Sequence, residues 1–217
     1  LLFCSNSYLG LSSDPRLVDA VARSLDHYPV GSGAARLISG STSRHEALER
    51  KCADLKGCEA AVLFSTGYMA NLGTVTALAG SGDAVFEDRL NHASLLDAGL
   101  LSRARLGRYS HADPASLEER LASSKGERKL VLTDGVFSMD GDIAPLPQLA
   151  EVSVRHGAWL MVDDAHGLGV VGAGGRGTLS HYQLSGKEVP ILMGTLGKAL
   201  GTFGAFVLMT SPEWFYR

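Results

Sequence analysis

One lysine stands alone in a long apolar stretch of the sequence. Residues 191–209 read ILMGTLGKALGTFGAFVLM, and Lys198 is the single charged side chain among them. A lysine held in apolar surroundings has a lowered pKa, so its ε-amine can act as a nucleophile and form a Schiff base with a carbonyl compound. The flanking glycines would let a flat, bulky partner approach the backbone. The alternative is an ordinary lysine in a surface loop, where most lysines lie.

A carboxylate and an imidazole follow another apolar run, at residues 158–163. Asp163 ends this run and His166 comes three residues later. A buried aspartate needs a cationic or hydrogen-bonding partner, and a protonated pyridine nitrogen would serve. The pair could instead be half of a metal site completed by His92 or His181, although neither an HExxH motif nor paired CxxC motifs support a metal. A helix cap or a polar loop is the ordinary alternative for each residue.

A candidate phosphate site lies at residues 65–68, where an expected strand gives way to a helix. Backbone N–H groups at a helix N-terminus, here those of Gly67 and Tyr68, bind phosphate well. The chain has no GxGxxG or GxxxxGK[ST] motif, which disfavours nicotinamide dinucleotides and Walker-type ATP binding. His92 opens another expected helix, and Ser138 lies in FSMDGD (residues 137–142), which otherwise reads as a turn.

The elements that must position these groups alternate between strands and helices. Strands are expected at 60–65, 83–87, 105–110, 129–133, 158–163, 190–195 and 204–209. Helices are expected from Pro15 to about Tyr28, from a capping box at Ser43–Glu46 to Gly57, and near 67–79, 92–102, 114–123 and 146–156, with Asp14 as the cap of the first. Several strands are apolar throughout, as in a parallel sheet covered on both faces, so the sequence predicts an α/β domain. Ligands of such sheets bind beyond the carboxyl ends of the strands, where these polar groups collect.

A membrane helix is the rival interpretation of residues 191–209, because about 20 apolar residues span a bilayer. Lys198 would then lie near the bilayer centre, at a cost of about 2.5–3.5 kcal/mol. Glycine recurs through the run, so two short buried strands joined by a glycine loop fit better.

Composition narrows the function classes further. The chain has 217 residues and a net charge of −3, which gives no indication of a nucleic-acid surface. Three cysteines without metal-site spacing are expected to be free thiols in the cytoplasm. The chain begins without Met, and residues 212–217 read as the first turn of a helix, so we expect a fragment of a longer protein.

The ends of four apolar strands would therefore present a phosphate cradle, a carboxylate, an imidazole and an amine nucleophile. This combination is the protein half of a pyridoxal 5′-phosphate site, in which a lysine holds the cofactor and an aspartate pairs with the pyridine nitrogen.

Six motifs, in order and spacing, resemble the α-oxoamine synthases, which are fold-type I pyridoxal-phosphate enzymes. The matching segments are SNSYLGL (5–11), GSGAAR (31–36), NHAS (91–94), GVFSMDG (135–141), VDDAHG (162–167) and GTLGKALG (194–201). The resemblance covers essentially the whole chain. It implies that residues 1–217 are the cofactor-binding large domain, without the family's N-terminal segment and C-terminal small domain, and that the enzyme is a homodimer.

The resemblance also implies a role for each residue of the site. Lys198 would hold the cofactor and later move protons at the substrate α-carbon, while Asp163 would keep the pyridine nitrogen protonated. His92 would stack on the ring and contact the substrate. The remaining implied contacts are Ser138 and His166 with the phenolic oxygen, Gly67, Tyr68 and Thr195 with the phosphate or its surroundings, and Asn6 with the substrate carboxylate.

The implied reaction is a decarboxylative condensation of an amino acid with an acyl thioester. The DDAHG form of residues 163–167 favours the branch that joins L-alanine to pimeloyl-CoA or its carrier-protein form. The nearest alternative joins glycine to acetyl-CoA. A catalytically inactive homologue that serves as a partner subunit is a further alternative, which the intact Lys198 disfavours.

Overall fold

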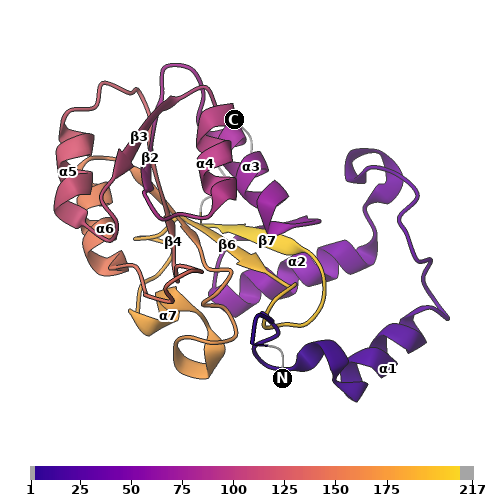
Figure 1. Cartoon of the computed structure of the whole chain (residues 1–217). Coiled ribbons are helices and arrows are strands. Elements are labelled where there is room, and N and C mark those ends of the chain that lie inside the picture. The colour runs from indigo at the N-terminus through magenta and orange to yellow at the C-terminus, as the bar shows by residue number, and fades with distance from the viewer. Residues whose placement is uncertain (1–2, 211–217) are drawn as a thin grey trace.

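A seven-stranded sheet forms the centre of the computed structural model, which describes residues 3–210 (Figure 1). The strand order is β1-β7-β6-β5-β4-β2-β3, and β7 runs antiparallel to both of its neighbours while the other neighbouring pairs are parallel. The strands are β1 (Ala60–Phe64), β2 (Ala84–Asp88), β3 (Arg105–Tyr109), β4 (Lys129–Asp134), β5 (Trp159–Asp163), β6 (Ile191–Thr195) and β7 (Ala205–Met209). Each lies within a residue or two of a predicted apolar run, so the predicted α/β class with a mostly parallel sheet is confirmed.

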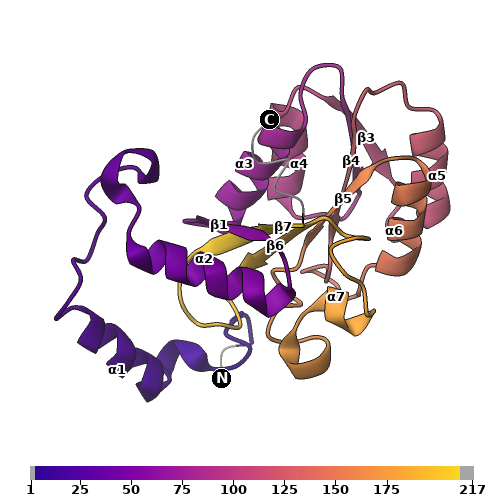
Figure 2. The same ribbon diagram turned by 180° about the vertical axis from the view of Figure 1, so that it is seen from behind.

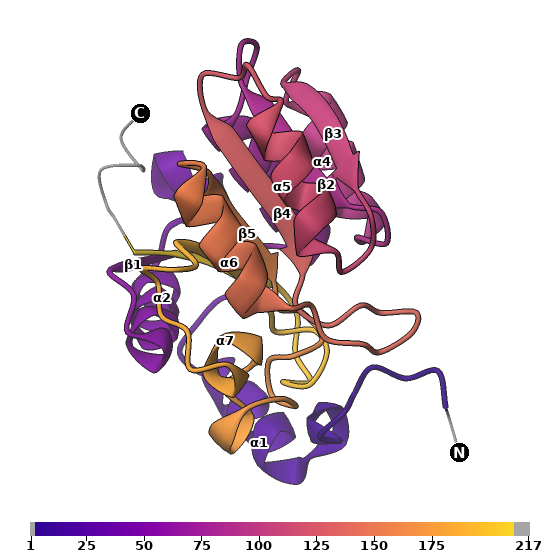
Figure 3. The ribbon, with the colours of Figure 1, turned by 90° about the vertical axis from the view of Figure 1, so that its left-hand side faces the viewer.

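Helices cover both faces of this sheet, as the apolar strands require. One hydrophobic core contains side chains of α3 (Gly67–Leu78) and α4 (Ala93–Leu101) packed on the sheet. The other contains side chains of α2 (Ser43–Lys56), α5 (Pro114–Ala122), α6 (Leu146–Arg155) and α7 (Thr178–His181). Figure 2 shows α2 lying across β1, β7 and β6, and Figure 3 shows α5 and α6 in front of β4 and β5.

The helix ends agree with most of the predicted caps. Asp14 caps α1 (Pro15–Ser24) by accepting a hydrogen bond from the N–H of Arg16, and Gly57 closes α2 with φ 65°. The capping box of α2 lies one residue earlier than predicted, because Thr42 and not Ser43 is the cap and its N–H donates to Nδ1 of His45 at 3.2 Å.

Helix α1 is shorter than predicted. It ends at Ser24 and not near Tyr28, because the N–H of Leu25 donates to the carbonyl of Ala22 and tightens the last turn. The helix buries none of its residues. It extends away from the sheet in Figures 1 and 2, so no packed core prolongs it.

Three irregular turns were not predicted. They are η1 (Leu11–Ser13), η2 (Arg36–Gly40) and η3 (Ala173–Gly175), and α7 was not predicted either. The helical turn expected at 212–217 lies outside the described residues.

The lysine-bearing run folds as strand, loop and strand. Strands β6 and β7 are its two halves, and they pair with each other. Within residues 3–210 no helix is long and apolar enough to cross a membrane. Gly201 has φ +67°, and a Cβ there would collide with the backbone of Leu11 and Ser12. Gly201 therefore makes room for the backbone of the N-terminal segment. The sequence alone had indicated that the glycines near Lys198 make room for a ligand.

Candidate active site

The predicted polar groups meet around one cavity of about 170 Å³. It lies where the carboxyl ends of β4, β5 and β6 face the first turns of α3 and α4, as expected for this class of sheet. Eight of the nine predicted residues line it: Gly67, Tyr68, His92, Ser138, Asp163, His166, Thr195 and Lys198. Asn6 is not in the lining. Five residues without a predicted role complete the wall: Asn71, Ser94, Asp134, Ala165 and Met193.

Lys198 lies in the loop between β6 and β7, three residues beyond the end of β6. Its Nζ is 2.7 Å from Nε2 of His166. Burial lowers the pKa of the Lys198 amine, although the carboxyl groups of Asp163 and Asp134 act in the opposite direction. A lowered pKa increases the neutral fraction of the amine, which is the nucleophilic form.

His166 links Lys198 to the N-terminal segment. Its Nδ1 lies 2.6 Å from Oη of Tyr8, whose O–H donates to Oδ1 of Asn6 at 3.2 Å. Burial, reinforced by Lys198 and His92, lowers the pKa of His166 to about 4, so this imidazole is neutral at pH 7. One donor order satisfies every contact: Lys198 donates to His166, His166 donates to Tyr8, and Tyr8 donates to Asn6. Asn6 thus reaches the site through a chain of hydrogen bonds.

Asp163 ends β5 with its carboxylate buried, at 5% exposure. It accepts hydrogen bonds from Nδ2 of Asn71 at 2.7 Å and from the N–H of Ala165 at 3.0 Å. Burial raises the pKa of Asp163 against these bonds. Asn71 also donates to Oγ of Ser94 at 2.8 Å. Asn71 lies four residues after Gly67 and therefore on the same face of α3. This spacing is the sequence signal that could have identified Asn71 as a residue of the site.

Asp134 ends β4 directly beside Asp163 in the sheet register. Its carboxylate accepts a hydrogen bond from the N–H of His92 at 3.0 Å. Burial, followed by the charge of Asp163, raises the pKa of Asp134 to about 8. Two adjacent buried carboxyl groups resist ionising together, so a cation in the cavity would favour the charged form of both.

Hydrogen bonds also hold several of the other lining residues. His92 is the cap of α4, because its Nδ1 accepts a hydrogen bond from the N–H of Ser94 at 3.2 Å. The same residue lines the cavity, so it has both of the roles considered for it. Gly67 and Tyr68 begin α3 behind the cap Thr66, and the Tyr68 hydroxyl donates to Asp97. Oγ1 of Thr195 donates to the carbonyl of Gly204 at 3.1 Å.

The alternative interpretation as a metal site requires several His, Cys, Asp or Glu side chains close together. Among residues 3–210 no cluster of three or more His, Cys, Asp or Glu side chains could hold a metal ion. His181 packs edge-on against Tyr182, with 4.7 Å between the ring centroids, and is not in the cavity wall. Cys4, Cys52 and Cys58 are all free, as predicted.

Asp164 points away from the cavity and holds the loop that follows β5. Its carboxylate accepts bonds from the N–H of Thr178 at 3.0 Å and from Oγ1 of the same residue at 2.8 Å. Nζ of Lys56, at the end of α2, lies 4.0 Å away and also donates to the carbonyl of Arg176. Burial raises the pKa of Asp164 to about 6, although Lys56 opposes the shift.

Asp164→Ala is expected to destabilise the protein by about 3 kcal/mol, because it leaves the side chain of Lys56 without its counter-ion and two buried donors of Thr178 without their acceptor. Asp164→Asn is expected to cost less, because its amide oxygen can still accept a hydrogen bond from Thr178. Urea denaturation of the full-length variants, followed by circular dichroism, measures both effects. Equal losses for the two variants would contradict this role of the carboxylate.

The comparisons with known proteins agree with the motifs. The family model described as aminotransferase class I and II matches residues 1–215. The 8-amino-7-oxononanoate synthase of Methylococcus capsulatus is 65% identical over 205 residues, which cover 94% of this chain and 53% of that protein. The enzyme of the same name from Cellvibrio japonicus is 58% identical over 207 residues, covering 95% of this chain and 52% of that protein.

Solved structures show the same fold. Serine palmitoyltransferase of Sphingomonas wittichii superimposes with a TM-score of 0.93 at 38% identity, covering 97% of this chain and 53% of that one. The 8-amino-7-oxononanoate synthase of Francisella tularensis gives a TM-score of 0.84 at 34% identity, covering 99% of this chain and 59% of that one. The chain spans about half the length of the curated relatives it matches. The predicted resemblance to α-oxoamine synthases is thus confirmed, and the chain belongs to the aminotransferase class I and II family.

Proposed function

We propose that the protein containing this chain is a pyridoxal-phosphate-dependent acyltransferase that makes 8-amino-7-oxononanoate in biotin biosynthesis. The observation that carries the proposal is the cavity in which Lys198, Asp163 and the first turn of α3 converge. The substrate class rests on the relatives of that name, at 58–65% identity. L-alanine and pimeloyl-CoA, or a pimeloyl carrier protein, would be the substrates.

The donor set of the cavity fits pyridoxal 5′-phosphate. Asp163 is a buried acid whose raised pKa reflects lost hydration, and a protonated pyridine nitrogen would supply the missing positive charge. Lys198 supplies an amine of lowered pKa for the aldehyde. Gly67 and Tyr68 stand at the N-terminus of a 12-residue helix, which suits a phosphate. Ser138 and His166 supply groups for the phenolic oxygen, and Thr195 a hydroxyl near the phosphate.

When bound, this cofactor supplies an electron sink for a carbanion at the α-carbon of an amino acid. Lys198 would bind the cofactor covalently and, once displaced by L-alanine, would take the proton from the substrate α-carbon. Its neutral neighbour His166 leaves the amine free to accept that proton. Asp163 would hold the proton on the pyridine nitrogen. His92 would orient the ring and the substrate, and Asn6 would lie near the substrate carboxylate.

In the overall reaction a bond forms between the α-carbon of L-alanine and the thioester carbonyl carbon. The carbon–sulfur bond breaks, and the thiolate that leaves takes up a proton in place of the one removed from the α-carbon. The α-carboxylate leaves as CO₂, and a proton from solvent replaces it on the α-carbon. We propose that residues 1–217 form the cofactor-binding large domain, in agreement with their share of the relatives' length. We also propose a cytoplasmic homodimer, a state supported by strongly exposed apolar side chains such as Val30 and Leu37, each 95% exposed.

A substrate matrix tests this function. Full-length protein, loaded with pyridoxal 5′-phosphate, is combined with L-alanine or glycine and with pimeloyl-CoA or acetyl-CoA, and release of free thiol is followed. The pair of L-alanine and pimeloyl-CoA is expected to react fastest. A preference for glycine and acetyl-CoA would favour the ligase branch, and no release with any pair would favour an inactive homologue.

A further inference from the structure

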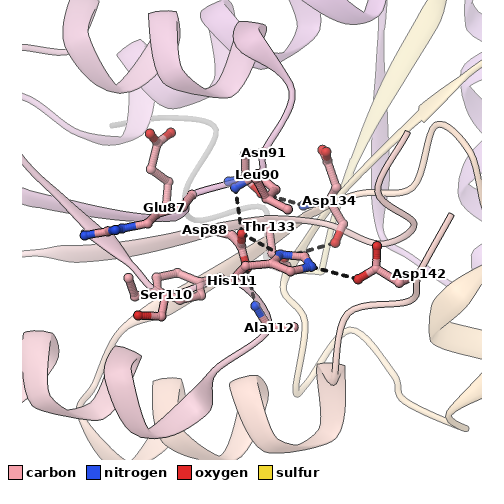
Figure 4. A network of polar contacts seen from close by, with 12 residues as sticks. Glu87, Asp88, Leu90, Asn91, Ser110, His111, Ala112, Thr133, Asp134 and Asp142 are labelled. Carbon is pink, nitrogen blue, oxygen red and sulfur yellow. Dashed lines mark hydrogen bonds and ion pairs between the residues drawn. The ribbon is translucent and has the colours of Figure 1, made fainter. Parts of the chain in front are cut away.

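His111 lies between two carboxylates that come from two different turns, each of which carries one residue of the cavity wall (Figure 4). Its Nδ1 is 2.9 Å from Oδ1 of Asp88, and its Nε2 is 2.9 Å from Oδ2 of Asp142. His111 itself follows β3, and none of the three residues lines the cavity. The imidazole therefore joins two parts of the chain that the described function does not connect.

The first part is the turn from Asp88 to His92. Asp88 ends β2 fully buried, and its carboxylate also accepts bonds from the N–H groups of Leu90 at 2.8 Å and Ala112 at 2.7 Å. Asn91 continues the turn, with its Nδ2 donating to the carbonyl of Leu132 at 3.0 Å. His92, the next residue, lines the cavity. The position of Asp88 therefore fixes the start of the turn that places His92 in the cavity wall.

The second part is the turn Phe137–Asp142, which carries Ser138 into the cavity wall. Its ends are joined by a bond from the N–H of Phe137 to the carbonyl of Asp142 at 2.9 Å. The His111 ring contacts both ends, because it also packs edge-on against Phe137 with 4.4 Å between centroids and 84° between planes. Ser138 follows Phe137 directly, so its position depends on this contact.

The geometry determines the protonation of His111. A neutral imidazole has one N–H, but both ring nitrogens face carboxylate oxygens, which only accept, so both nitrogens must donate. Burial opposes the charge, but Asp88 from β2 and Asp142 from the turn outweigh it and raise the pKa of His111. Two other charged side chains lie near the ring. Glu87, on β2, points away from the ring in Figure 4 and forms an ion pair with Arg108 on β3. Asp134 is the last residue of β4.

The backbone beside His111 is also strained. Ala112 has φ 48°, in the left-handed region that alanine rarely adopts, and its N–H is the one bonded to Asp88. The surrounding contacts must hold Ala112 in this conformation. This supports a structural role for the contacts between His111 and the two turns.

We propose that His111, as an imidazolium, is a positioning residue that braces the turn bearing His92 against the turn bearing Ser138, and so sets the affinity for pyridoxal 5′-phosphate. The identity of this ligand rests on the proposed function. A histidine with a raised pKa contributes its bonds below that pKa and loses them as the pH rises through it. Affinity is therefore expected to fall as His111 loses its proton.

The first test measures the dissociation constant of pyridoxal 5′-phosphate against pH in full-length protein. Asp142→Asn removes one of the two carboxylates, so His111 should lose its proton at lower pH and the fall in affinity should move to lower pH. Asp140→Asn, an exposed residue of the same turn, is the matched control and should leave the curve unchanged. His111→Gln should weaken binding about tenfold near pH 7, the size of one lost charge-assisted hydrogen bond, and should lack this pH step. Coincident curves for all four proteins would overturn the proposal.

The second test needs no cofactor. Hydrogen-exchange protection of residues 137–142 in the full-length protein should fall with rising pH in the wild type, and at lower pH in Asp142→Asn. If protection follows His111 but no pH gives cofactor binding, the brace stands and the proposed function fails. Protection that is independent of both pH and the Asp142 substitution would overturn the brace, whatever the protein binds.

Discussion

Lys198→Gln is expected to lower the rate of thiol release by the full-length protein by at least ~10³-fold, because glutamine offers neither a nucleophile nor a base. The wild-type amine is well suited to both roles. Burial lowers its pKa, and the neighbouring imidazole of His166 is uncharged at pH 7. Borohydride treatment followed by mass spectrometry should fix pyridoxal 5′-phosphate on Lys198 in the wild type and leave Lys198→Gln unmodified.

Lys187→Gln is the matched control, because Lys187 is exposed and lies outside the cavity wall. It should retain the full rate and the borohydride adduct. A Lys198→Gln protein that kept a tenth of the wild-type rate would contradict the role given to this lysine.

Asp163→Asn is expected to lower the rate of thiol release about 10²-fold or more while the protein still folds. The loss follows because an amide cannot hold a positive charge on a pyridine nitrogen as a carboxylate does. The fold should survive because burial already raises the pKa of Asp163, so the native state tolerates a neutral group there. Oδ1 of Asn71 is buried without a partner among the described residues, and rotation of that amide would let it accept a bond from the new side chain.

Asp164→Asn provides the contrast, because it makes the same chemical change one residue further along. Asp164 faces Thr178 and Lys56 and not the cavity, so its substitution should leave the rate within a few-fold of the wild type. Thermal melting followed by circular dichroism reports folding of both variants, and the thiol assay reports function. A rate for Asp163→Asn that is as close to the wild type as that of Asp164→Asn would contradict the role given to Asp163.

The positions of the strands and helices depend on local signals in the sequence. Strand and helix positions follow from apolar runs and caps, such as Asp14 before Pro15, because these signals act over a few residues. The errors are local as well. The cap of α2 is Thr42 and not the predicted Ser43. Helix α1 ends at Ser24 and not near Tyr28, because it packs on no hydrophobic core. Neither error touched the site.

The partners of the site residues belong to the non-local part. Nothing in the sequence pairs Asn71 with Asp163, Tyr8 with His166 across 158 residues, or His111 with both Asp88 and Asp142. These contacts depend on the strand order, which places β4 and β5 side by side and inserts β7 between β1 and β6.

The sequence by itself determined which chemical groups stand at the ends of the strands, because apolar runs end where polar residues begin. Only the tertiary structure decided which of these groups meet and how their pKa values move. Burial and the approach of other charges act through space, so Asp134 and His111 acquire their properties from segments that the sequence order keeps apart.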